Sequence, residues 1–271
     1  MADESRQQRR ARQRDWLKIG RAAFDDGLRP EPRREEVYGA ALVLRAKLKE
    51  RGNVTRASEA AGLAQKLAEA SRASFAAKEA VACAKGCAHC CHNYVGVIPP
   101  EVFAIARAIR QGARQGNTFL EPAAVLERGR ATRDKSPEER IGAKIACQLL
   151  GTAGACSVYA VRPLVCRQTA SFLVEACKSE LEGDRSLMTV PNRHMAAGSN
   201  AHLALLAAMK SVGMPTIGYE LAAALEVALT TPDAEARWLA GDTIFSALTN
   251  IIRRPAAVEG VVARIADEVG G

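Results

Sequence analysis

The chain has 271 residues, of which 48% are hydrophobic and 25% charged, a balance that excludes a disordered chain and a peptide-sized scaffold. Only 4% of the residues are aromatic and alanine is abundant, which favours closely packed helices and excludes a large all-β fold. The net charge is +8 at pH 7, and residues 1–21 carry seven cations against three anions, so this segment supplies half of it. Because the segment has no recognised nucleic-acid motif, we interpret it as a solvated tail and do not expect nucleic-acid binding.

The sequence contains no run that approaches the roughly 20 apolar residues needed to cross a bilayer, and its first residues lack the apolar core of a signal peptide. These features predict a soluble, cytoplasmic protein with no membrane span. Because cytoplasmic thiols stay reduced, the eight cysteines are expected to be metal ligands or reactive groups and not a disulfide framework.

Two helices are predicted on either side of Gly52. Apolar residues between Tyr38 and Leu48 recur at helical spacing, and Gly52 can end this first helix. After Thr55, apolar residues spaced by three and four predict a second helix with one buried face. The members of this stripe are Ala60, Leu63, Ala64, Leu67 and Phe75.

Two proline-containing sequences predict further helix starts. After the extended stretch 93–98, Pro100 and Glu101 fit a first helical turn. Ser136-Pro137-Glu138-Glu139 has the pattern of a capping box, and we expect its helix to run toward Cys147.

Beyond Asn200 the chain has no cysteine, and three or four Ala-rich helices are predicted there, separated by Gly213-Met214-Pro215, Thr231-Pro232 and Arg254-Pro255. The predicted fold is mainly α: a helical bundle with an irregular cysteine-rich metal-binding centre and at most short strands. The expected division is a disordered basic tail at 1–32, a helical domain at 33–199 whose core at 80–180 binds metal, and a C-terminal helical bundle at 200–271 packed on it.

Four cysteines, Cys83, Cys87, Cys90 and Cys91, lie within nine residues. Buried free cysteines usually occur singly, whereas the two-residue gap between Cys87 and Cys90 lets both sulfurs reach one metal ion without strain. Cys90 and Cys91 are adjacent, so their side chains leave the backbone in different directions. They therefore serve two metals, or one of them lies outside the ligand shell.

The other four cysteines are Cys147, Cys156, Cys166 and Cys177, with eight, nine and ten residues between them. A closed metal site commonly combines a tight cluster with distant ligands. Eight thiols exceed the four that one Zn²⁺ or one cubane cluster requires, so either two sites exist or several cysteines are not ligands.

The pattern Cys83-x3-Cys87-x2-Cys90-Cys91, followed by Cys156-Ser-Val-Tyr159-Ala-Val-Arg162-Pro163-Leu-Val-Cys166-Arg167, resembles the YkgJ-type cysteine-cluster family of zinc- or iron-chelating domains. The resemblance covers roughly residues 80–180, and Glu101 matches the acidic residue that opens a helix behind the family's cluster. It implies a bound metal or iron–sulfur centre without a single agreed activity. We expect the ligands to be Cys87, Cys90, Cys156 and Cys166, then Cys83, Cys91 and Cys147, with Cys177 last because it lies outside the most specific motif.

Polar neighbours of the cysteines have expected roles as well. Four thiolates around Zn²⁺ leave a net charge of −2, which Arg162 and Arg167 on either side of Cys166 could offset while donating hydrogen bonds to sulfur. His89 and His92 are alternative ligands, less expected because thiols are in excess. Zinc and iron–sulfur clusters both accept all-thiolate ligands, so the spacing does not distinguish them.

The leading hypothesis is a cytoplasmic metal-binding protein with a cysteine-ligated zinc or iron–sulfur centre. The alternative is an S-adenosylmethionine-dependent protein lysine N-methylase, because flagellin lysine methylases are similar to this family through the same cluster. We find no Gly-rich nucleotide loop and assign no catalytic or cofactor-binding residue. Cys83-x3-Cys87-x2-Cys90 also has the spacing of radical S-adenosylmethionine enzymes, but the strands of their β/α barrel are missing downstream. Whether a reaction is catalysed, and whether a protein partner binds, are left open.

Overall fold

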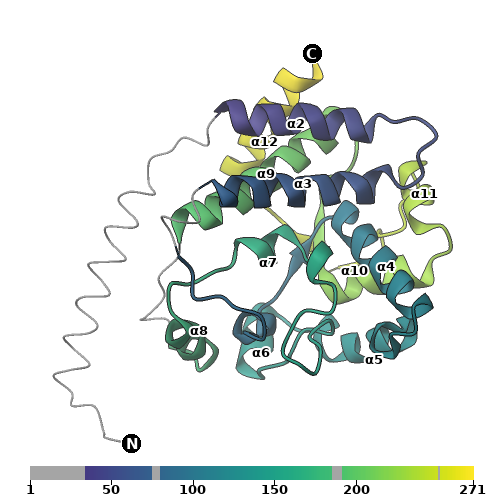
Figure 1. The fold of residues 1–271 in the computed structure, drawn as a ribbon. Coiled ribbons are helices and arrows are strands. Elements are labelled where there is room, and N and C mark those ends of the chain that lie inside the picture. The colour runs from purple at the N-terminus through teal and green to yellow at the C-terminus, as the bar shows by residue number, and fades with distance from the viewer. Residues whose placement is uncertain (1–33, 75–79, 185–190, 250) are drawn as a thin grey trace, which may run out of the picture.

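The computed structural model describes residues 34–74, 80–184, 191–249 and 251–271. Within these residues the chain forms eleven α-helices and one antiparallel sheet of three short strands. This confirms the predicted mainly α fold with at most short strands. The long helices α2, α3, α9 and α12 lie across the upper part of the molecule, and the remaining helices lie below them (Figure 1). The predicted basic tail at 1–32 lies outside the described residues.

The upper layer is built around α9 (Asn192–Ser211), which contacts the three other long helices and one short helix, α7 (Leu164–Gln168). Small alanine side chains along α9 let the neighbouring backbones approach closely, and Leu205 and Leu206 are almost fully buried between them. The two helices predicted around Gly52 are confirmed, and Phe75 of the predicted second stripe lies outside the described residues. The helices around α9 are α2 (Arg34–Leu48), α3 (Arg56–Ala73) and α12 (Ala256–Gly270).

The lower layer places α4 (Pro99–Arg114) between α3 above and α10 (Leu221–Thr230) beside it. The helix start predicted at Pro100 is confirmed to within one residue. The Phe103 ring on α4 packs against the ring of Trp238, with 5.6 Å between the ring centroids. Trp238 lies in the short helix that follows α10. The other helices of this layer are α5 (Pro122–Arg133) and α11 (Ala234–Leu239).

The sheet joins the cysteine-rich segment to the C-terminal third of the chain. Strand β1 (Gly96–Val97) pairs with β2 (Gly218–Glu220), and β2 pairs with β3 (Ile251–Ile252). Leu221 N extends the pairing by donating to Val95 O (3.0 Å). Since α9 also runs unbroken past residue 200, both α9 and the sheet connect the two predicted helical domains. Their boundaries stay a prediction.

Short helices surround the cysteines. The predicted capping box is confirmed: Glu139 N donates to Ser136 Oγ (3.2 Å), and Ser136 N donates to a Glu139 carboxylate oxygen (2.7 Å). The helix ends sooner than expected, because Lys144 has a positive φ (50°) and the next amide, Ile145 N, donates back to Arg140 O (3.2 Å). This is a Schellman arrangement with lysine where glycine is usual. The short helices are α6 (Pro137–Gly142), α7 (Leu164–Gln168) and α8 (Val174–Leu181).

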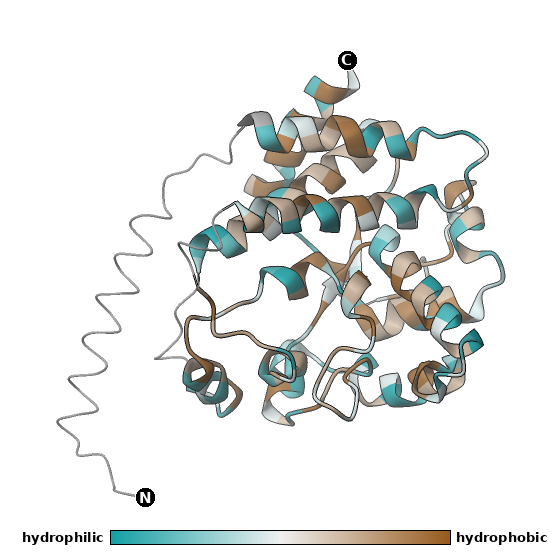
Figure 2. Cartoon of the chain, in the orientation of Figure 1, coloured by the Kyte–Doolittle hydropathy of each residue, from teal (hydrophilic) through white to brown (hydrophobic). Residues whose placement is uncertain are grey.

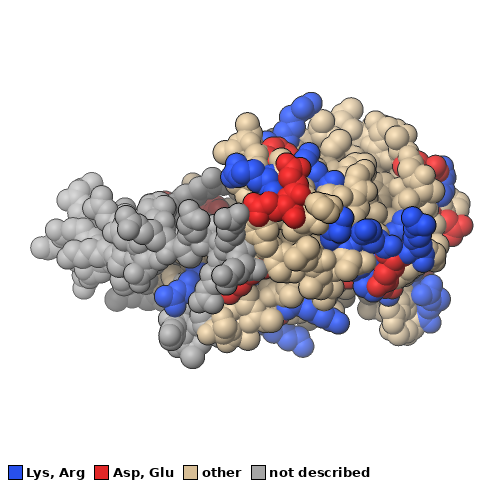
Figure 3. All heavy atoms as spheres, turned by 90° about the horizontal axis from the view of Figure 1, so that it is seen from above, with Lys and Arg blue, Asp and Glu red and all other residues tan. Residues whose placement is uncertain are grey.

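The surface mixes polar and apolar residues. Figure 2 shows hydrophilic and hydrophobic residues alternating along the outer helices, as amphipathic helices require. On the face seen in Figure 3, cations and anions occur among broad uncharged areas and do not form one basic surface. Among the described residues, no helix has the length and apolarity that crossing a bilayer demands.

Candidate metal centre

Two loops bring the first cysteine cluster against the segment that carries Cys156. A turn at Gly86 is closed by a hydrogen bond from Cys87 N to Ala84 O (3.0 Å). Gly154 has a positive φ (70°), and a Cβ placed on it would lie 2.9 Å from Gly86 O. Residue 154 therefore has to be glycine for the two backbones to meet.

Five cysteines from three segments line one cavity of about 70 Å³. The segments are tied together by backbone hydrogen bonds: Cys147 N donates to Cys91 O (2.7 Å). An isolated antiparallel bridge between Leu150 and Cys156 then folds the chain back on itself. The cysteines that line the cavity are Cys90, Cys91, Cys147, Cys156 and Cys166, the last of them on α7.

Cys83, Cys87 and Cys177 form a second group that does not line the cavity. Ala82 N donates to Ser171 O (2.9 Å), which holds the start of the cluster near α8, the helix that carries Cys177. The Cys177 thiol interacts electrostatically with the thiols of Cys83, Cys87 and Cys90. Cys90 therefore neighbours both groups.

Burial favours the neutral form of most cavity thiols. It raises the pKa of Cys147 and Cys156, and raises that of Cys166 most strongly. Cys90 differs because the Cys91 thiol donates a hydrogen bond to its sulfur, which lowers the pKa of Cys90 and raises that of Cys91. Since metals bind the thiolate form, a cation in the cavity would replace these protons.

Two arginines, the buried Arg140 and the half-buried Arg162, supply positive charge at the cavity. Arg162 lines it, and its Nε is buried without a hydrogen-bond partner among the described residues. Arg140 is 1% exposed, hydrogen-bonds Cys147 through its side chain, and pairs with the fully buried Glu220 (Nη1 to Oε1, 3.4 Å). Arg140 Nε likewise has no partner among the described residues. An anionic thiolate centre would supply acceptors for the two Nε atoms, because a buried donor without a hydrogen-bond partner is costly.

The expected role of Arg167 is met only in part: burial raises the pKa of the Cys156 thiol and the positive charge of Arg167 opposes that rise, but the hydrogen bonds of Arg167 go to backbone oxygens. Its guanidinium donates to the carbonyl oxygens of Arg162 (3.2 Å), Tyr159 (3.0 Å) and Ala160 (2.7 Å), and it pairs with Glu69 on α3. These donors are therefore directed at the backbone of the loop before α7. Arg167 fastens the loop that carries Arg162 to the upper layer.

Glu101 fastens the same loop to α4. Its carboxylate is 1% exposed and accepts from Ile98 N (3.2 Å) at the start of α4 and from Leu164 N (2.7 Å) at the start of α7. The acidic residue singled out in the sequence therefore joins two helix starts, one that follows the first cysteine cluster and one that directly precedes Cys166.

Replacing Glu101 with Gln is expected to lower the free energy of unfolding by about 1–3 kcal/mol, because one amide oxygen cannot accept from both buried N–H groups. Urea unfolding followed by circular dichroism measures the loss. Glu139→Gln is the matched control, since Glu139 makes the same capping contact at an exposed site where water can replace it. Equal losses in the two variants would contradict the bridging role.

The donor set fits a soft metal, although the side chains do not converge on one point. Within residues 34–74, 80–184, 191–249 and 251–271, no group of three or more His, Cys, Asp or Glu side chains has the arrangement of a metal site. Ligation by four of the cavity thiols would therefore require rotations about their χ1 angles. The fit rests on the thiols around one cavity and on the unpartnered Arg162 Nε.

A comparison with protein families identifies the same region. Residues 82–183 match a metal-chelating family. The family is described as "Putative zinc- or iron-chelating domain", and its match includes all eight cysteines. The resemblance drawn from the cysteine spacing is thereby confirmed for this part of the chain. No match was found among curated proteins or solved structures.

The structure divides the predicted ligands into two groups. Five of the seven line the cavity, whereas Cys83 and Cys87 lie with Cys177 outside it. Which cysteines ligate stays a prediction. His89 and His92 belong to a half-buried 3-10 turn and do not line the cavity.

Sequence reasoning missed Arg140 and Glu220. Arg140 lies in a charged helical turn and Glu220 precedes an Ala-rich helix, so both resemble ordinary surface residues in the sequence. The sheet pairing and the α6 cap bring them together across 80 residues. No local pattern could have revealed this pair, because it depends on the tertiary fold.

Proposed function

We propose that the protein binds a zinc ion or an iron–sulfur cluster in the cavity lined by the five cysteines, and that this centre holds the central region in its fold. The observation that carries the proposal is the meeting of thiols from three sequence-distant segments beside the buried, unpartnered Arg162 Nε. When bound, the metal would supply a cross-link among these segments. Arg140 and Arg162 would offset the negative charge of the thiolates.

A structural role is supported by the local fold of this region. Between α6 and α7 the chain contains one 3-10 turn, Tyr159–Val161, and one isolated bridge. Such a segment has few regular hydrogen bonds to stabilise it, so a cross-link contributes a large share of its stability. The long helices outside it have their own buried apolar contacts.

The test is anaerobic purification followed by visible absorption and metal analysis of one sample. An iron–sulfur cluster would give a brown protein absorbing near ~400 nm with comparable iron and sulfide. A colourless protein with about one or two zinc ions per chain would indicate a thiolate zinc site. A fully folded protein that holds neither metal would refute the proposal.

Arg162→Gln is expected to weaken zinc or iron binding by roughly 10- to 100-fold, because the centre would lose a neighbouring positive charge and donor. Titration against a competing chelator measures the change. Arg130→Gln is a suitable control: Arg130 is 67% exposed on α5 and pairs only with Glu127 in the described residues. If both variants bind metal as the unmodified protein does, Arg162 does not support the centre.

We also propose a cytoplasmic location. All eight cysteines are described and none is in a disulfide, which is the state that a reducing compartment maintains. Fractionation of cells that express the tagged full chain tests this location. Recovery with secreted protein, in disulfide-bonded form, would contradict it.

Protein lysine N-methylation is the second hypothesis, and it rests on the family resemblance alone. Calorimetry of the metal-loaded protein with S-adenosylmethionine tests it directly. Absence of binding at millimolar concentrations would remove this hypothesis and leave the metal-binding proposal untouched.

A further inference from the structure

A pocket outside the matched region brings four cations together without an acidic neighbour. It has a volume of about 610 Å³, and its lining residues lie between 45 and 56 and between 211 and 241. The cations are Arg45, Lys49, Arg51 and Arg56, and none of the thirteen lining residues is Asp or Glu. The pocket therefore belongs neither to the cysteine region nor to residues 82–183.

The positive charge of this pocket is not compensated within the described part of the chain. Arg45 donates to the carbonyl oxygen of Gly270 (2.9 Å) and Arg56 to that of Asn53 (3.0 Å), both neutral acceptors. Lys49 and Arg51 are exposed and make no ion pair with a described residue.

The two acidic residues closest in sequence are already engaged. Glu50, between Lys49 and Arg51, pairs with Lys47 (2.7 Å), and Asp242 pairs with Arg237 (2.7 Å). Neither carboxylate therefore cancels the charge of the pocket.

Helix-end electrostatics explain only part of this arrangement. Arg45 lies in the last turn of α2, where the partial negative charge of the helix favours a cation. Arg51 lies beyond that helix, and Arg56 begins α3, where the helix dipole disfavours a cation. The dipoles therefore do not account for all four positive charges.

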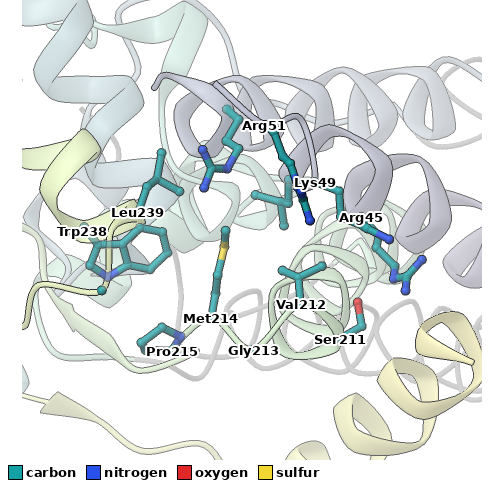
Figure 4. Close-up of a pocket in the computed structure, with 13 residues that line it drawn as sticks. Arg45, Lys49, Arg51, Ser211, Val212, Gly213, Met214, Pro215, Trp238 and Leu239 are labelled. Atoms are coloured by element: carbon teal, nitrogen blue, oxygen red, sulfur yellow. The ribbon is translucent and has the colours of Figure 1, made fainter. Parts of the chain in front are cut away.

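Apart from Ser211, the rest of the lining is apolar. Figure 4 shows Trp238 and Leu239 at one side of the pocket, the turn from Ser211 to Pro215 along another, and Arg45, Lys49 and Arg51 facing them. Met214 lies between these groups. Its amide donates to Met209 O (2.9 Å) across the positive-φ residue Gly213, which fixes the turn at the end of α9.

We propose that this pocket binds a small organic anion that carries two or more negative charges and a flat ring with apolar faces, the chemistry of a nucleotide. Its volume falls within the range of small-molecule sites, which combine apolar walls with a few placed charges. The cations hold the phosphate or carboxylate groups, and the apolar portion packs against Met214 and Leu239. The proposal is independent of the metal centre.

The test is calorimetry on the full, metal-loaded chain at low ionic strength with four probes: adenosine 3′,5′-bisphosphate, AMP, adenosine and inorganic phosphate. The expected order of affinity is bisphosphate, then AMP, with adenosine and inorganic phosphate weaker than both, because the pocket recognises charge and ring together. Failure of the bisphosphate to bind below about 1 mM would overturn the proposal. Equal affinity for bisphosphate and inorganic phosphate would overturn the role of the apolar wall.

The double variant Lys49→Gln/Arg51→Gln is expected to weaken bisphosphate binding about tenfold, since two exposed charge contacts are lost. Lys66→Gln/Arg264→Gln is the matched control, because it removes the same two charges from exposed positions outside the pocket. Similar affinities for the two double variants would show that only overall charge matters and would refute the site. Metal content, measured on every sample, separates this result from any failure of the metal centre.

Discussion

Removing the metal with a chelator is expected to lower the melting temperature of the protein by roughly 10 °C, which corresponds to about 3–5 kcal/mol of unfolding free energy. The reason is local, since the chain between α6 and α7 would lose the proposed cross-link among the cavity cysteines. The helices α2, α3 and α9 pack directly against one another through buried apolar side chains and should keep their structure. Thermal unfolding by far-ultraviolet circular dichroism, before and after chelation and after metal is restored, measures both effects.

Two serine variants locate the centre responsible for this loss. Cys166→Ser should reproduce the effect of the chelator and lower the metal content, because Cys166 lines the cavity. Cys177→Ser is the matched control, since Cys177 belongs to the second thiol group. Equal loss of metal in both variants would contradict assignment of the centre to the cavity. A melting temperature that chelation leaves unchanged would contradict the structural role.

The sequence predicted most of the long helices because the signals for a helix are local. The stripe after Thr55 and the capping box at Ser136 each specify a helix through residues three or four positions apart. Local signals do not fix where a helix ends. Helix α6 ends early because Lys144 adopts a left-handed conformation, which is uncommon outside glycine, asparagine and aspartate. The strands β2 and β3 were not foreseen, because two or three residues are too few to show a period of two.

The sequence predicted only part of the cysteine arrangement. Spacing identified the donors, since four thiols in nine residues rarely occur in an ordinary core. It could not divide eight thiols between the cavity and the group around Cys177, because this division depends on how α7 and α8 pack. Arg140 and Glu220 show the same limit, since a buried ion pair between residues far apart in sequence leaves no local pattern.

Arg167→Ala is expected to lower the free energy of unfolding by about 3–5 kcal/mol, measured by urea unfolding of the metal-free protein. The side chain is 5% exposed, and its loss would remove hydrogen bonds to three part-buried carbonyl oxygens together with the ion pair to Glu69. Arg130→Ala is the control, because the 67% exposed Arg130–Glu127 pair should contribute less than about 0.5 kcal/mol. A loss below about 1 kcal/mol for Arg167→Ala would mean that water replaces the guanidinium.

Arg167→Lys separates charge from geometry at the same position. Lysine keeps the positive charge near Glu69, but its compact ammonium cannot reach all the acceptors that the planar guanidinium spans. We therefore expect a loss of stability between those of the unmodified protein and the alanine variant. Arg162→Gln should show the opposite balance, with weaker metal binding and little change in the stability of the metal-free chain. The two arginines, five residues apart, would then have different main roles. Arg167 would stabilise the fold of the loop, and Arg162 would offset the charge of the proposed metal centre.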